Sequence, residues 1–454
     1  MLRRFVLVLP TLLALALPAA QTPGGLTPKD LYALQAVGDV QVSPDGTRVA
    51  YSVVHNDGPG RPYAVVSILN LETGRSVALP RGAYAPRWAP DGRRLAFMGQ
   101  SPEGAGLMVS EADGSGARFL APVQGTNHPL PSAGESVAWA PDGRRIAYVS
   151  ATPGPESADA NGDPMVITRY LYKPTAGEGS TRFNDNRRTH LFVVDVGTRQ
   201  VAQLTEGTAY EHSIDWAPAG DDIVFVSNRE ADPDKTFNYD VFTVSSRTKQ
   251  VRRLTSSRSA EYSPVWSPDG TRLAFAGTRR DLTSSETTME DTHVWVMNAD
   301  GTARLEIGAG VDNRQGAPRW SADGRHVYFP LQERGQVRLA RLPAGGGPLE
   351  LVVSERGAVG AWGLGRNAIA YAFTRPDRPA DLYTLGFGAA ATPQRRTTLN
   401  ATLLGARAVA PVEAFRVASA DGTEIEAFLT LPLGRSAASR HPMIVMIQLV
   451  SWPP

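Results

Sequence analysis

Serine and histidine are the residues in this 454-residue sequence that could carry covalent catalysis, since it contains no cysteine. A serine nucleophile on a strand-to-helix elbow needs glycine two positions before it and two positions after it, because the turn there is very tight. Ser76, Ser101, Ser136 and Ser436 have the first glycine, but Ala, Glu, Ala and Ala stand at the second position. The sequence therefore predicts no catalytic serine of the elbow type.

Metal and cofactor sites are likewise not predicted. The seven histidines include no pair at the spacing that places two metal ligands on one helical face, and no thiolate ligand or disulfide is possible. The repeated Pro-Asp-Gly aspartates are expected to form turns rather than bind calcium. Pro343–Glu350 lacks the Lys and the Ser or Thr of a phosphate-binding loop. A triad assembled from distant residues stays open, because such sites are spatial and not sequential.

The charge balance indicates which partners are not expected, and the first residues indicate where the protein acts. Lys+Arg 46 against Asp+Glu 45 leaves no basic excess, so nucleic acid is not expected as a partner. Arg3 and Arg4 precede an apolar stretch, 5–17, that ends before Ala19 and Ala20, which is the pattern of a secretory signal. We expect residues 1–20 to be a cleaved signal peptide and the protein to be periplasmic or extracellular. The apolar stretch is too short to span a bilayer, so no membrane span is expected after cleavage.

Seven copies of one pattern organise the chain. The copies begin at Val42, Trp88, Trp139, Trp216, Trp266, Trp320 and Trp362, and the sequence at Trp88, WAPDGRRLAFM, is representative. Their spacings of 46, 51, 77, 50, 54 and 42 residues match a four-stranded propeller blade, apart from one long gap. In the form SPDG, Ser, Pro and Gly suit the first, second and fourth positions of a type I turn, and the alternation that follows is that of a strand.

Each copy is followed by a second strand-turn-strand motif, such as HLFVVDVGTRQVAQLT after the third copy. Seven pairs of hairpins predict an all-β fold, a seven-bladed β-propeller over residues 40–410. The repeated Trp side chains are expected in the core between blades and not at a ligand site.

Three segments depart from the repeat. Residues 21–39 are expected to hold a short helix with Thr27 as N-cap and Pro28 at its first position. The long gap contains MVITRYLYK, which alternates like a strand. Arg169 and Tyr170 within it are weak candidates for residues that face the propeller channel, and a surface or packing role is the favoured alternative for both. Residues 411–454 begin with two alternating segments around Asp421 and Gly422, which predicts a hairpin.

The sequence resembles the prolyl-oligopeptidase family of serine peptidases, nearest to its acylaminoacyl-peptidase and dipeptidyl-peptidase-like branch. The resemblance rests on the seven blades, the opening LTPKDLYALQAVGDVQVSPDG, the middle stretches ITRYLYK and RRTHLFVVDV, and the exit hairpin RVASADGTEIEAFLTLP. It implies a propeller that limits which short peptides reach the Ser-Asp-His triad of an α/β-hydrolase domain. In the family that domain opens with a hairpin and a strand leading into His-Gly-Gly-Pro.

The match to the family breaks after Ile447. HPMIVMI, 441–447, resembles the strand before His-Gly-Gly-Pro, but Gln448, Leu449, Val450 and Ser451 follow. We therefore expect residues 411–454 to be the truncated start of a hydrolase domain, a stub whose strand would be buried in a complete domain. With no catalytic, cofactor or metal residues assigned, this chain is expected to be inactive alone.

Three functions stay open. The first is the gating propeller of an exported peptidase that has lost its hydrolase domain. The second is a secreted propeller of the TolB type that binds peptides or a protein partner; the 44 residues after Ala410 count against it. The third is a hydrolase with an unrecognised site or a separately made catalytic domain. The oligomeric state is not predicted.

Overall fold

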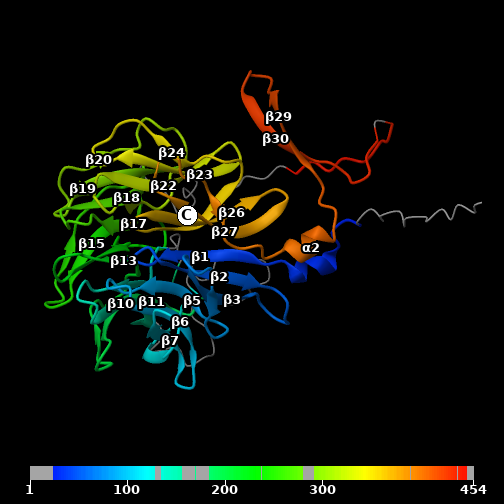
Figure 1. The fold of residues 1–454 in the computed structure, drawn as a ribbon. Helices are drawn as coiled ribbons and strands as arrows, with labels where there is room; N and C mark the ends of the chain where they lie inside the picture. The colour runs from blue at the N-terminus through cyan, green and yellow to red at the C-terminus, as the bar shows by residue number, and fades with distance from the viewer. Residues whose placement is uncertain are drawn as a thin grey trace, which may run out of the picture.

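The computed structural model describes residues 24–127, 134–155, 169, 184–236, 238–279, 291–388, 390–436 and 438–446. Within these residues the chain forms antiparallel sheets that follow one another around a central axis (Figure 1). Consecutive strands pair with each other, so each sheet is built from one continuous stretch of sequence. This is a β-propeller, and the all-β prediction is confirmed.

Five of the sheets have four strands each, and we call each of them a blade. The first has β1 (Ala36–Val42), β2 (Arg48–His55), β3 (Tyr63–Asn70) and β4 (Ser76–Ala78). The second has β5 (Tyr84–Trp88), β6 (Arg94–Ser101), β7 (Gly104–Glu111) and β8 (Arg118–Pro122). The third has β9 (Val137–Trp139), β10 (Arg145–Pro153), β11 (Arg187–Asp195) and β12 (Val201–Gln203). The fourth has β13 (Glu211–Trp216), β14 (Asp222–Ser227), β15 (Asp240–Ser245) and β16 (Val251–Arg253). The fifth has β17 (Glu261–Trp266), β18 (Arg272–Thr278), β19 (Thr292–Asn298) and β20 (Leu305–Glu306).

The sixth and seventh repeats share one eight-stranded sheet, so the prediction of seven separate blades is wrong. Its first half has β21 (Arg319–Trp320), β22 (His326–Glu333), β23 (Gln336–Pro343) and β24 (Glu350–Val353). Its second half has β25 (Ala358–Leu364), β26 (Ala368–Arg375), β27 (Arg378–Gly386) and β28 (Gln394–Arg395). The halves are joined because β23 and β25 approach closely enough to form one parallel pair, Val337 with Ala358.

The Ser-Pro-Asp-Gly segments form the turns that the sequence predicts. In the first blade the Gly46 amide donates to the Ser43 carbonyl at 2.8 Å, and Gly46 has φ 72°, which glycine adopts without strain. The Asp45 carboxylate accepts hydrogen bonds from the Ser43 hydroxyl at 2.6 Å and the Thr47 amide at 3.0 Å. The aspartate of the repeat is therefore a turn-forming residue, as predicted.

The repeated tryptophans lie in the interfaces between blades, as predicted. Each of the six is at most 9% exposed. Three of the indole groups also donate to the preceding blade: Trp88 Nε1 to the Gln41 carbonyl at 3.3 Å, Trp139 Nε1 to the Arg87 carbonyl at 3.0 Å, and Trp320 Nε1 to the Val265 carbonyl at 3.2 Å. A buried indole N–H needs such an acceptor, so these bonds fix the stacking of neighbouring sheets.

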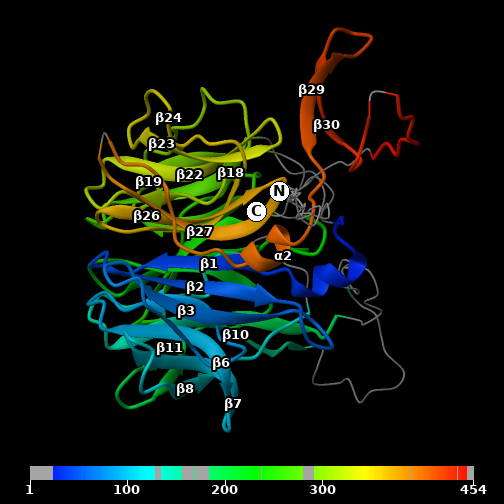
Figure 2. The same cartoon turned by 45° about the vertical axis from the view of Figure 1, so that its right-hand side comes forward.

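The ring closes by packing the first blade on the eight-stranded sheet. Strand β1 lies beside β25, β26 and β27 (Figures 1 and 2). Val37, Val40 and Val49 share an apolar cluster there with Ala370 and Leu382. Because every sheet of the described structure consists of consecutive strands, no described strand from the first blade completes the last sheet.

Polar contacts outside the sheets reinforce this closure. The Gln35 amide donates to Asn400 Oδ1 at 2.9 Å, and Asn400 Nδ2 donates to the Gln35 carbonyl at 2.8 Å. The short helix predicted near Thr27 is confirmed as the 3-10 helix η1 (Pro28–Ala33), in which Asp30 accepts from the Thr27 amide at 2.8 Å. Asp30 also pairs with Arg407 at 3.0 Å, just after α2 (Ala401–Gly405). These bonds join the residues that precede and follow the propeller.

The residues after the propeller form the predicted hairpin but not the predicted strand. Strands β29 (Val412–Ala418) and β30 (Glu424–Thr430) pair around Asp421 and Gly422 and project from the sheets (Figure 2). Residues 443–446 of the predicted strand 441–447 form no strand and are 67–88% exposed, since no neighbouring strand pairs with them in the described structure. An α/β-hydrolase stub is thus not formed by these residues.

The predicted strand MVITRYLYK lies outside the described residues, apart from Arg169. Within the part of the chain that is described, no helix has the length and apolar character needed to cross a membrane.

Candidate functional site: an axial charge cluster

Charged residues stand directly before the repeated tryptophan in three of the innermost strands. These are Arg87 in β5, Asp215 in β13 and Arg319 in β21. Side chains alternate between the two faces of a strand. Because each tryptophan packs against a neighbouring sheet, the preceding residue is directed to the other face of its strand.

The two arginines meet in a cavity of about 380 Å³. Residues from β1, β5, β21 and β25, together with residues 134–136 just before β9, line it. Glu135 forms an ion pair with Arg87 and a second one with Arg319, whose Nη2 lies 3.0 Å from Glu135 Oε1. Asp39 lines the same cavity and accepts a hydrogen bond from the Ala85 amide at 3.3 Å.

Burial and repulsion between like charges shift the pKa values of the residues in this cluster. Burial, together with the nearby Arg319 charge, lowers the pKa of Arg87 to about 10, and burial also lowers the pKa of Arg319. Burial raises the pKa of Asp215 to about 6, although the Trp266 amide donates to its Oδ2 at 2.8 Å. Both arginines remain charged near neutral pH, so Glu135, which pairs with both, offsets one of their two positive charges.

Of the two channel candidates named from the sequence, Arg169 lies elsewhere and Tyr170 lies outside the described residues. Arg169 Nε donates to Asp234 Oδ2 at 3.0 Å, and its Nη1 donates to the Tyr210 hydroxyl at 2.8 Å. Its side chain is 11% exposed. Arg169 therefore binds residues near the fourth blade and is not part of the axial cluster.

Two serine–histidine contacts occur in the described structure; the one between His441 and Ser439, at 3.1 Å, joins two exposed side chains, and the one between His212 and Ser213 does not resemble a nucleophile and its base. His212 Nδ1 lies 2.9 Å from the Ser213 hydroxyl, but both residues are buried. Burial lowers the pKa of His212 to about 3, and among the described residues its Nε2 has no hydrogen-bond partner that could orient the ring. In the same described regions, no group of three or more His, Cys, Asp or Glu side chains is placed to hold a metal ion.

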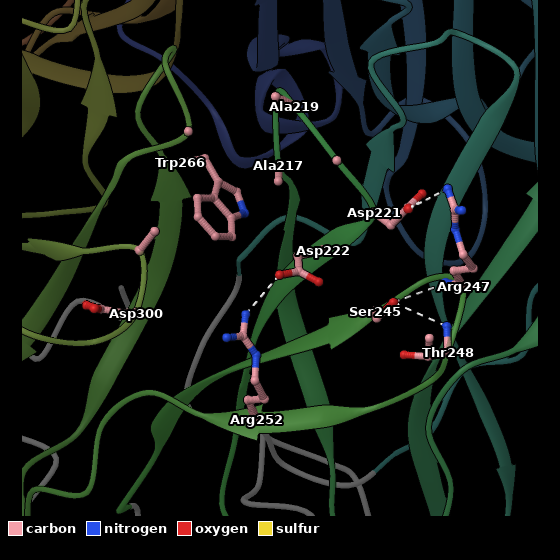
Figure 3. Close-up of a pocket in the computed structure, with 13 residues that line it drawn as sticks. Ala217, Ala219, Asp221, Asp222, Ser245, Arg247, Thr248, Arg252, Trp266 and Asp300 are labelled. Atoms are coloured by element: carbon pink, nitrogen blue, oxygen red, sulfur yellow. Dashed lines mark hydrogen bonds and ion pairs between the residues drawn. The ribbon is translucent and has the colours of Figure 1, made fainter.

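A larger crevice of about 650 Å³ lies between the fourth and fifth blades, where hairpin turns meet (Figure 3). Four of its five charged side chains are already paired, Asp222 with Arg252 and Asp221 with Arg247, each at 2.9 Å, and Asp300 accepts hydrogen bonds from Thr302. A similar crevice of about 580 Å³ lies between the first and second blades. Because the crevice recurs with the repeat, it reflects the blade geometry, and the axial cluster is the stronger candidate for a functional site.

Sequence reasoning missed the axial cluster, although a signal for part of it was present. A charged residue directly before the repeated tryptophan, as in Arg87, Asp215 and Arg319, marks a charge on the face of an innermost strand opposite the tryptophan. Glu135 carries no such signal, since it lies four residues before Trp139.

Comparisons with known proteins identify peptidases as relatives. The chain is 30% identical over 456 residues to the uncharacterized peptidase YuxL of Bacillus subtilis, which covers 93% of this chain and 66% of that protein. The fold superposes on an acylaminoacyl peptidase in complex with Z-Gly-Gly-Phe-chloromethyl ketone, with a TM-score of 0.71 at 18% identity over 90% of this chain and 60% of that one. No family model matches the sequence.

The isolated propeller of a third protein is also similar. The β-propeller domain of the Trilobed protease from Pyrococcus furiosus, described as having an open velcro topology, matches with a TM-score of 0.57 at 17% identity, over 81% of this chain and 99% of that one. The ring of sheets is thus a β-propeller whose fold matches the propellers of these two peptidases.

The chain belongs to the prolyl-oligopeptidase family of peptidases and matches its propeller portion, which confirms the resemblance seen in the sequence. It spans about two thirds of the length of the YuxL peptidase.

Proposed function

We propose that this chain is the substrate-gating propeller of an exported serine peptidase that acts on short peptides. The observation that carries the proposal is the 30% identity to a peptidase over nearly the whole of this chain. The axial cavity supports it, since charged side chains on the propeller axis can select what passes along it. The basic and apolar opening residues support export.

Peptide binding by the purified chain tests the proposal. A fluorescent N-acetylated tripeptide titrated with the 454-residue chain should show saturable anisotropy, reversed by unlabelled tripeptide but not by a folded protein of similar charge. Specific binding of a folded protein without tripeptide binding would favour the TolB-like alternative and contradict the gating proposal.

Hydrolysis is tested separately with a chromogenic acyl-aminoacyl ester. We expect no turnover, because the sequence contains no G-x-S-x-G elbow. Turnover that a serine-directed fluorophosphonate abolishes would show that a catalytic serine lies within these 454 residues and would overturn that expectation.

A further inference from the structure

The ion pair between Glu135 and Arg319 joins strands that are not neighbours in the ring. Innermost strands contact each other in the order β1, β5, β9, β13, β17, β21, and β25 returns to β1. Glu135 precedes β9, whereas Arg319 lies in β21, so two innermost strands separate them on the shorter way round. Two residues that are 184 positions apart in the sequence therefore meet across the axis.

Arg87 provides a second connection to the same carboxylate. It lies in β5, which is next to β9 in the ring, and its Nη1 also donates to the Pro86 carbonyl at 2.6 Å. Both arginine side chains and the glutamate are only partly accessible, at 17%, 33% and 28% for Arg87, Arg319 and Glu135. We call these three side chains the axial bridge.

The ends of the axial bridge are held by the neighbouring sheets. The Arg319 guanidinium carbon lies 5.4 Å from the ring centroid of Trp362 in β25, within cation–π range. The Glu135 carbonyl accepts a hydrogen bond from the Ile214 amide of the fourth blade at 2.8 Å. Because these contacts attach the axial bridge to several sheets, its side chains are less free to change conformation than a single unattached side chain.

We propose that the axial bridge closes the propeller channel to peptides, so that passage along the axis requires these ion pairs to break. Charged groups in a partly desolvated cavity interact more strongly than in water, and breaking the bridge leaves at least one of them unpaired. Glu135, Arg87 and Arg319 are then the residues that determine which peptides pass along the axis. This inference rests on the proposed gating function for its biological meaning, but its test does not require peptidase activity.

The absence of cysteine from the sequence permits a direct test of access. Ala361, in β25, lines the same cavity as the axial bridge, so Ala361→Cys places one thiol there. We call this thiol the cavity thiol. Its labelling rate is measured with N-ethylmaleimide and with a maleimide joined to a tripeptide. Thr73→Cys, in the exposed turn between β3 and β4, provides a reference thiol that reports the intrinsic reactivity of each reagent.

The expected result is a change that depends on reagent size. With the bridge intact, the peptide maleimide should label the cavity thiol much more slowly than N-ethylmaleimide does, when each rate is divided by that of the reference thiol. Adding Glu135→Ala should raise the peptide-maleimide rate about tenfold, the factor that corresponds to about 1.4 kcal/mol. Arg375→Ala, which breaks an exposed ion pair with Glu355 of 2.9 Å, is the matched control and should leave the rate unchanged.

Equal peptide-maleimide rates with and without Glu135→Ala would overturn the proposal. Glu135→Gln keeps the side-chain volume and serves as the second variant if Glu135→Ala unfolds, as judged by thermal melting; it should raise the same rate in the same direction. Tripeptide binding together with an unchanged labelling rate would reject the axial bridge and retain the gating function. If the chain does not bind tripeptide but labelling depends on reagent size as expected, the gating function is rejected and the axial bridge is retained.

Discussion

Asp215 illustrates how the protonation of a single carboxyl group between two blades affects the stability of the fold. Its carboxylate is partly buried and accepts from the Trp266 amide at 2.8 Å, and burial raises its pKa from 3.8 to about 6. A carboxyl whose pKa is higher in the folded than in the unfolded chain holds its proton more tightly when folded. Its contribution to stability is therefore full below about pH 4 and declines as pH rises through 6.

We predict that Asp215→Asn flattens this pH dependence. The free energy of unfolding of the wild type, followed by urea denaturation, should contain a decline of about 2 kcal/mol between about pH 4 and about pH 7 that the variant lacks. Asn can still accept the Trp266 amide, which keeps the contact between the fourth and fifth blades. Asp300→Asn is the control, since Asp300 lies in an exposed turn where hydrogen bonds lower its pKa. Identical slopes for wild type and Asp215→Asn would contradict the prediction.

At the scale of the element, blades are joined by arginines as well as by tryptophans. Arg272, at the start of β18, lies over the Trp320 ring, with its guanidinium carbon 4.8 Å from the ring centroid. Its Nη2 also donates to the Gly324 carbonyl at 3.0 Å. Arg94, at the start of β6, makes the equivalent contacts with the third blade. The repeat thus places one arginine so that it contacts both the aromatic ring and the turn of the next sheet.

Arg272→Ala should lower the free energy of unfolding by about 1 to 2 kcal/mol, because it removes a cation–π contact and a hydrogen bond to a carbonyl. Arg272→Lys should recover part of this loss, since an ammonium keeps the charge over the ring. Chemical denaturation measures both variants, with Arg325→Ala on the exposed part of the next turn as control. A loss for Arg272→Ala no larger than for Arg325→Ala would show that this contact does not stabilise the interface.

The elements were predictable from the sequence to the extent that their causes are local. The Ser-Pro-Asp-Gly turns and the hairpin at Asp421 and Gly422 follow from residues that contact each other within a few positions. The joining of β23 to β25 was not predictable, because one parallel pair between Val337 and Ala358 depends on how two neighbouring repeats approach in space. The arginine contacts between blades were missed for the same reason.

At the scale of the whole molecule, the candidate functional site depends on closure of the ring. Glu135 and Arg319 meet only when the sheets have completed most of a circle, and periodicity along the chain gives no information about which side chains face each other across it. The sequence therefore predicted a propeller and a family but did not identify the residues of the axial cluster, and Arg169, its weak channel candidate, pairs with Asp234. Local sequence patterns determine the blades, whereas the side chains that meet on the axis are determined only by how the whole ring assembles.

The exposed segment after the hairpin gives a prediction for the molecule in solution. Met443, Ile444, Val445 and Met446 are 74%, 88%, 67% and 80% exposed, a continuous apolar run. Such a run with unpaired backbone groups favours association between chains. Ile444→Glu should therefore reduce the light scattering of concentrated protein severalfold and shift its gel-filtration profile towards monomer.

Val201→Glu is the matched control for this prediction, because Val201 is also exposed, at 46%, but is an isolated apolar residue on the outer strand β12. It adds the same charge without interrupting an apolar run, so light scattering should remain close to that of the wild type. Equal effects of the two substitutions would mean that net charge controls association. No effect of Ile444→Glu would locate the cause elsewhere, and the exposed apolar face of the hairpin, which includes Phe415, Val417 and Ile425, would then be tested by Phe415→Glu.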